Sequence, residues 1–220
     1  MSKLILVLAM ALLAAGCTPL SQPAPEIRDY DLRYASPAIT GEPLEVVLAI
    51  PSLGVSATYD REAIVYRVGP NQIGKYFYDR WATNPADLIA DALARDFANS
   101  RLYRAVTHQR SPLAYNYQLA GEIEVIEERG GGTPCTAVLT MRFLLVRQGA
   151  VTRDAVLARP RFEMVKSTPC NKPEKLVQSI SELLSQISAQ LQQQVYDAIR
   201  ADIATHPPKP TLNPPEAAGS

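Results

Sequence analysis

The sequence feature that most constrains the fold is a long apolar stripe near the C-terminal end. From Pro173 to Ile199, apolar residues recur every three or four positions, and Gln and Ser occupy many of the places between them. This spacing predicts an amphipathic helix, and we expect its apolar face to lie along a sheet. The stripe consists of Leu176, Ile180, Leu183, Leu184, Ile187, Leu191, Val195 and Ile199.

The first half of the chain has strand and hairpin signals. Residues 44–50 form an apolar, β-branched run that ends at Pro51, which predicts a buried strand. Residues 63–68 and 73–78 flank the sequence Gly-Pro-Asn-Gln, whose residue types favour a turn. These two segments therefore predict a β-hairpin.

A second helix and a meander complete the expected fold. Asn84 and Pro85 suit the start of a helix that we expect to end near Ser100. Residues 103–107 predict a short strand, and the alternation that begins at Tyr115 starts a set of three antiparallel strands. These cover 115–125, 135–147 and 155–163. The element order predicts an α+β fold, with a mainly antiparallel or mixed sheet and two principal helices packed against it.

The N-terminal residues indicate export and lipid attachment. Lys3 precedes an apolar run from Leu4 to Ala15, and small residues then lead to Cys17. The run is too short for a membrane-spanning helix, which needs roughly 20 residues, and the order of segments is that of a signal peptide. Because the sequence before Cys17 resembles the bacterial lipobox, we expect its thiol to carry diacylglycerol and its amine an acyl chain. Ordinary secretion with a chance cysteine is the alternative.

The expected domain boundaries follow from these signals. Residues 1–16 are a signal peptide, and residues 17–25 a lipidated tether rich in Pro, Ser and Gln. Residues 26–205 form a single α+β domain, and residues 206–220 a Pro-rich tail that we expect to be disordered. Thr18 replaces the aspartate that retains lipoproteins at the inner membrane of enteric bacteria. This favours the periplasmic face of the outer membrane, with the inner membrane as the alternative.

The charge and cysteine content narrow the function classes. The 22 basic residues balance the 22 acidic ones, whereas a nucleic-acid binder normally shows a basic excess. With Cys17 assigned to lipid, Cys135 and Cys170 remain, and we expect them to pair as a disulfide in the oxidising periplasm. Two separate buried thiols are the alternative. Neither cysteine has histidine partners at the spacing of a metal site.

Catalytic and cofactor-binding signals are weak. The chain has two histidines, and His206 lies in the tail, so a Ser-His-Asp triad would depend on His108 alone. Gly130, the first of three consecutive glycines, opens a predicted turn with no phosphate-binding signature. Four carboxylates, Glu122, Glu124, Glu127 and Glu128, are expected on a solvated strand face. We therefore expect no catalytic residue, no metal and no cofactor.

Aromatic residues crowd the predicted hairpin and its surroundings. Packing between strands is the plain interpretation, and a partner- or lipid-facing surface is the functional one. The candidate residues for that surface are Tyr66, Tyr76, Tyr78 and Trp81. Tyr76 and Tyr78 share one face of the predicted strand, whereas Phe77 points to the other, so both interpretations can hold in part.

The combination of these segments resembles the ABC-type transport auxiliary lipoprotein component family, which includes the paraquat-inducible lipoprotein C group. The matching segments are Ile64–Arg67, Tyr76–Tyr78, Trp81 with the helix after it, Tyr117–Leu119, Val156–Phe162 and the closing helix. The resemblance covers roughly residues 44–199. Cys135, Cys170 and the Pro-rich tail depart from the family pattern.

This resemblance implies a non-catalytic role beside an ABC transporter. Such lipoproteins accompany systems whose substrate-binding proteins are of the mammalian-cell-entry (MCE) type and which move phospholipid or other apolar molecules. It implies the outer membrane and an MCE-type periplasmic protein with its transporter as partners. Because that partner is oligomeric, we expect a homo-oligomer. The alternative function is a lipoprotein activator of an envelope enzyme such as a peptidoglycan synthase.

Overall fold

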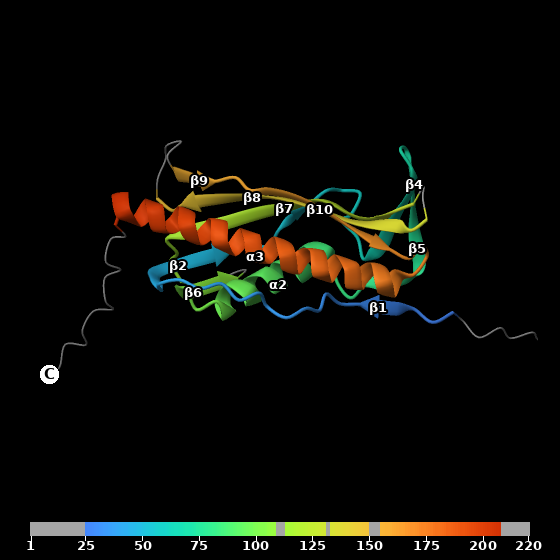
Figure 1. Cartoon of the computed structure of the whole chain (residues 1–220), viewed down its shortest axis with the longest axis horizontal. Coiled ribbons are helices and arrows are strands. Elements are labelled where there is room, and N and C mark those ends of the chain that lie inside the picture. Colours follow the sequence, from blue (N-terminus) through green and yellow to red (C-terminus); the bar gives the residue numbers. More distant parts are fainter. Residues whose placement is uncertain (1–24, 109–112, 131–132, 150–154, 208–220) are drawn as a thin grey trace, which may run out of the picture.

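The computed structural model describes residues 25–108, 113–130, 133–149 and 155–207. The expected signal peptide, Cys17 and most of both the tether and the tail lie outside these described residues. The described residues form the expected α+β fold, with two helices on one face of a mixed sheet (Figure 1). Within these ranges, no helix has the length and apolarity that a membrane-crossing helix needs.

Both helices form where the sequence predicts them. Helix α2 spans Pro85–Asn99, and the Asn84 side chain accepts a hydrogen bond from the Ala86 amide at its N-terminus. Helix α3 spans Pro173–Thr205, and every residue of the apolar stripe is buried. Burial of that stripe against the sheet therefore stabilises α3. The helix packs most closely against β10, β8 and β9.

The sheet contains ten strands. They are β1 (Arg28–Tyr30), β2 (Leu44–Ile50), β3 (Gly54–Val55), β4 (Ala63–Gly69), β5 (Gln72–Trp81), β6 (Tyr103–His108), β7 (Tyr117–Arg129), β8 (Cys135–Arg147), β9 (Val156–Ala158) and β10 (Arg161–Thr168).

Strand β7 organises the sheet because it pairs on both edges. On one edge it is antiparallel to β8 along its whole length. On the other edge it pairs in parallel with β2 near Tyr117, with β3 near Glu122 and with β4 near Glu128. The sheet thus divides into two arms, in which β2 continues to β6, and β4 continues to β5 and β1.

The expected meander is present, but its first and last strands differ from the prediction. The first strand, predicted over 115–125, is β7 over Tyr117–Arg129. The segment predicted as a single strand over 155–163 is two strands, β9 and β10, both antiparallel to β8. Pro160 lies in the break, and proline cannot donate a ladder hydrogen bond. Its carbonyl oxygen instead accepts from the Phe143 amide at 2.8 Å. The chain therefore bends between two short pairings with the same strand.

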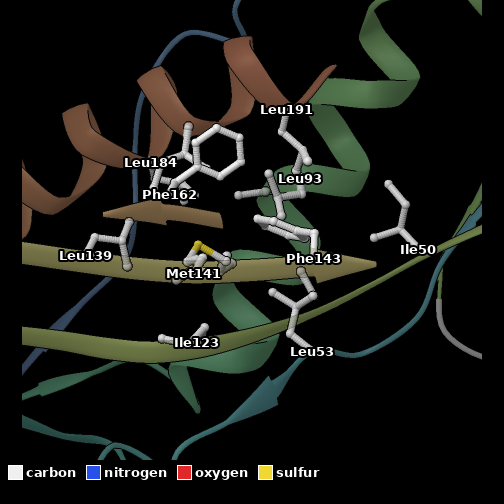
Figure 2. Close-up of a cluster of buried hydrophobic side chains, with 14 of the residues drawn as sticks. Ile50, Leu53, Leu93, Ile123, Leu139, Met141, Phe143, Phe162, Leu184 and Leu191 are labelled. Carbon is white, nitrogen blue, oxygen red and sulfur yellow. The ribbon is translucent and has the colours of Figure 1, made fainter. Parts of the chain in front are cut away.

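The core lies between the sheet and both helices. Figure 2 shows Leu93 of α2 and Leu184 of α3 pointing toward Met141 and Phe143 of β8. The Phe143 ring packs directly against Gly121 of β7. A Cβ atom added at Gly121 would be only 2.6 Å from Phe143 Cδ1. The absence of a side chain at Gly121 lets the phenyl ring lie flat on the strand.

Candidate interaction site

The structure separates the four aromatic candidates. Trp81 is 2% exposed and belongs to the core, so its expected place on a partner- or lipid-facing surface is wrong. Tyr66 and Tyr76 are half-buried, and their ring centroids are 5.1 Å apart. Tyr78 is exposed. The hairpin that carries them, β4–β5, is present as expected.

Among the described residues, the aromatic side chain with the highest exposed fraction is one that the sequence pattern did not select. Phe77 is 92% exposed. Ala63 pairs with Arg80 and Val65 with Lys75, so a single residue of β4 faces four residues of β5. This irregularity breaks the strand alternation and turns Phe77 and Tyr78 both toward solvent. An alternating pattern carries no signal for a bulge of this size.

A glycine lets the two half-buried tyrosines meet. The Tyr66 ring lies over Gly74, where an added Cβ would be 2.3 Å from Tyr66 Cζ. The Tyr66 ring then contacts that of Tyr76 at a tilt of 58°. Tyr66 and Tyr76 are therefore held by packing within the hairpin, whereas the Phe77 side chain projects into solvent.

The expectation that all four carboxylates lie on a solvated face is wrong for Glu127 and Glu128. These two residues are 1% and 3% exposed. A register shift between Ile123 and Val125 gives β7 one extra residue, which changes the alternation after Glu124. Glu122, before the shift, and Glu124, the extra residue at the shift, remain partly exposed.

The carboxylate of Glu127 is fully enclosed by donors. It accepts hydrogen bonds from the Tyr59 hydroxyl at 2.6 Å, from Arg67 Nε at 2.9 Å and from Arg129 Nε at 2.7 Å. Burial raises the pKa of Glu127, but these hydrogen bonds outweigh it and hold the pKa below its usual value. Burial, together with the hydrogen bond to Glu127, raises the pKa of Tyr59 to about 12. The cluster fixes β4 and the segment before it onto β7.

Glu128 lies on the opposite face of β7, near the start of α3. One of its oxygens accepts from the Tyr76 hydroxyl at 3.1 Å and from the Asn171 amide at 3.4 Å. Burial and the charge of Glu128 raise the pKa of Tyr76. This carboxylate therefore joins the hairpin to the turn before α3.

The expected disulfide is present at the same end of the sheet. Cys135 and Cys170 are bonded, with Cα atoms 5.0 Å apart. The bond ties the start of β8 to the turn that holds Asn171. Glu128 and the disulfide thus connect three segments: the hairpin, the start of β8 and the turn before α3.

His108 has structural contacts. Its Nδ1 is 2.8 Å from the Ile50 carbonyl oxygen, and its Nε2 is 2.8 Å from an Asp91 carboxylate oxygen. The ring therefore links β6 to β2 and α2. Among the described residues, no group of three or more His, Cys, Asp or Glu side chains could hold a metal ion.

Two shallow grooves accompany these features. One, of about 600 Å³, lies between the hairpin turn and the end of β7 and is lined by residues that include Tyr59, Arg67 and Arg129. The other, of about 540 Å³, lies on the face of β7 and β8 away from the helices and includes Glu122 and Arg142. In the first groove, Arg67 and Arg129 form ion pairs with Glu127. In the second groove, Arg142 forms an ion pair with Glu122.

Comparison with known proteins gives a family and a fold. The family model described as ABC-type transport auxiliary lipoprotein component matches residues 30–192. The crystal structure of protein XCC0632 from Xanthomonas campestris has a TM-score of 0.67 at 18% identity, covering 82% of this chain and 97% of that one. A crystal structure of an uncharacterized protein has a TM-score of 0.62 at 14% identity, covering 78% and 99%. At these identities the structures show the fold alone. No curated protein matches the sequence significantly.

Proposed function

The chain belongs to the ABC-type transport auxiliary lipoprotein component family, and from this premise we propose that it is a membrane-anchored accessory subunit of an MCE-type transport system. In this proposal it acts by binding partners while other subunits hydrolyse ATP. The cargo is phospholipid or another apolar molecule that crosses the envelope.

The family match over residues 30–192 is the observation that carries the proposal. Two features of the molecule support it. The signal sequence and Cys17 suit a lipid anchor in the outer membrane. The hairpin β4–β5 exposes Phe77 and Tyr78 while buried carboxylates fix its inner side, as suits a rigid surface for partner binding.

We also propose that the protein acts as a homo-oligomer. An MCE-type partner is oligomeric, and a symmetric accessory subunit would bury more surface against it than a monomer. Light scattering of the purified protein measures its mass directly. A monomer at all accessible concentrations would contradict this part of the proposal.

Purification from bacterial membranes tests the proposed function. A C-terminally tagged chain is extracted in mild detergent, and mass spectrometry identifies the acyl groups on Cys17 and the proteins that co-purify. We expect an MCE-type protein, a permease and an ATPase. Their absence would count against the transport role, and recovery of a peptidoglycan synthase would favour the alternative.

The matched control is Cys17→Ala, which removes the lipid attachment point and leaves residues 26–205 unchanged. We expect this variant to fold, to leave the outer-membrane fraction in a density gradient and to lose its function in cells. Full complementation by the unlipidated variant would show that the anchor is dispensable.

A further inference from the structure

Exposed apolar side chains gather at one end of the molecule. Of the seven large apolar residues that the described part of the chain exposes, five lie in β4, in β5 or directly before β1. We call these five the apolar end patch: Ile27, Val68, Ile73, Phe77 and Tyr78. Figure 1 shows β4 and β5 crossing the end of the molecule at which α3 begins, with β1 beside them.

The path of the chain leads from this patch toward Cys17. Strand β1 is parallel to β5, with Arg28 opposite Asp79. Ile27 directly precedes Arg28, so it lies at this end of β1, near the segment of β5 that carries Tyr78. Cys17 lies eleven positions before Arg28, so even a fully extended chain keeps them within about 40 Å.

We propose that the apolar end patch inserts into the surface of the lipid bilayer that holds Cys17, an inference that rests on the lipid anchor of the proposed function. Phe and Tyr are side chains that favour the membrane interface. The exposed Lys75 lies on β5 between Ile73 and Phe77. Cations at the rim of an apolar surface attract anionic headgroups.

The shape of the patch favours a bilayer over a protein groove as the occupant. Phe77 projects from a bulge and is almost wholly in solvent, so it suits insertion between lipids. The lipid on Cys17 also makes the contact intramolecular, which lets a small apolar area bind a nearby surface.

The contact would orient the domain. Helix α3 begins at the patch end and runs 33 residues toward the opposite end of the molecule, a length of about 50 Å (Figure 1). Insertion of the patch therefore directs the C-terminal end of α3 away from the membrane. That end would then be available to the periplasmic partner.

Fluorescence quenching by brominated lipid tests the contact. The full lipidated chain is reconstituted into vesicles of phosphatidylethanolamine and phosphatidylglycerol, with or without bromine on the acyl chains. Trp81 is the only tryptophan and is buried, so the wild-type protein gives the baseline. Phe77→Trp places a second tryptophan at a fully exposed site, where the exchange leaves the core unchanged.

The matched control is Leu113→Trp, because Leu113 is also exposed but lies before the start of β7, at the far end from β4. We expect brominated lipid to lower the added emission of Phe77→Trp by about twofold or more and to leave that of Leu113→Trp unchanged. Equal emission from Phe77→Trp in both kinds of vesicle would overturn the proposal. Shielding of the new tryptophan that depends on protein concentration, or on added transporter subunits, would overturn it too, in favour of a second copy or a protein partner.

The experiment separates this inference from the proposed function. Absence of quenching with intact co-purification of an ABC transporter overturns the membrane contact alone. Quenching of Phe77→Trp without any transporter subunit in the purified material upholds the membrane contact and contradicts the transport role.

Discussion

The Tyr59 hydroxyl donates a 2.6 Å hydrogen bond to Glu127, which lies 68 positions later in the chain. Arg67 and Arg129 bind the other oxygen of the same carboxylate. A buried carboxylate at the end of β7 thus holds the hairpin that carries Phe77. Because the carboxylate is fully enclosed, its charge makes a measurable contribution to stability.

Glu127→Gln should lower the free energy of unfolding by about 2–3 kcal/mol, because two arginines lose their counter-charge while the buried volume stays the same. The loss of stability is smaller than for a fully buried ion pair, since Arg67 and Arg129 are themselves partly exposed. Urea unfolding followed by circular dichroism measures the change. Glu163→Gln, at an exposed ion pair on β10, is the control and should change stability by less than about 0.5 kcal/mol. Equal effects of the two variants would show that the buried cluster is not stabilising.

The same carboxylate predicts a pH dependence. The pKa of Glu127 is lowered below 4.5 in the folded protein. Its contribution is therefore fully present above pH 4.5 and is lost as the pH falls through the folded value. Unfolding free energies measured from neutral pH down to about pH 3 should fall less steeply in Glu127→Gln than in the wild type. If the unfolding free energies of the wild type and Glu127→Gln fell equally steeply with decreasing pH, the assignment of this titration to Glu127 would be contradicted.

Gly121→Ala should destabilise the core by about 1–3 kcal/mol, because the added methyl group meets Phe143 and Leu53. Figure 2 shows Leu53 next to Phe143, among further core residues. Thermal unfolding measures the effect. Gly69→Ala is the control, since no atom lies within 4 Å of its added Cβ. A neutral Gly121→Ala would mean that Phe143 can move without cost.

Removal of the disulfide should cost about 2–4 kcal/mol, because the bond closes a loop with a sequence separation of 35 residues. The double variant Cys135→Ala, Cys170→Ala should unfold at a lower temperature than the wild type. Reductant should lower the melting temperature of the wild type and leave that of the double variant unchanged. A wild type that is insensitive to reductant after full reduction of the bond would contradict this prediction.

Asp96→Ala should loosen the N-terminal segment of the domain. Asp96 of α2 is fully buried and accepts hydrogen bonds from Tyr34, Ser36 and Ser188, and so joins that segment to both helices. Arg95 also donates to this carboxylate. We expect a loss of about 2–3 kcal/mol, because four side-chain donors lose their acceptor. Hydrogen exchange should increase most over residues 31–43. Asp87→Ala, at an exposed carboxylate in the first turn of the same helix, is the control.

Local patterns were sufficient for much of the fold. The stripe from Leu176 to Ile199 predicts α3, and Asn84 with Pro85 predicts the start of α2, because helix periodicity and capping depend on neighbouring residues. The strand boundaries at Leu44–Ile50 and Cys135–Arg147 agree with the structure for the same reason. The parallel pairing of β7 with β2, β3 and β4 could not be read in this way, since it joins segments distant in the sequence.

The sequence by itself determined the α+β class, the helices, the hairpin and the family resemblance, because each depends on residue order over short stretches. Only the tertiary structure decided which candidate side chains are available to a partner. It buries Trp81 and encloses Glu127, and it exposes Phe77 through an irregular pairing between β4 and β5. Exposure depends on register and on what covers each face, and a bulge in one strand changes both without a local signal.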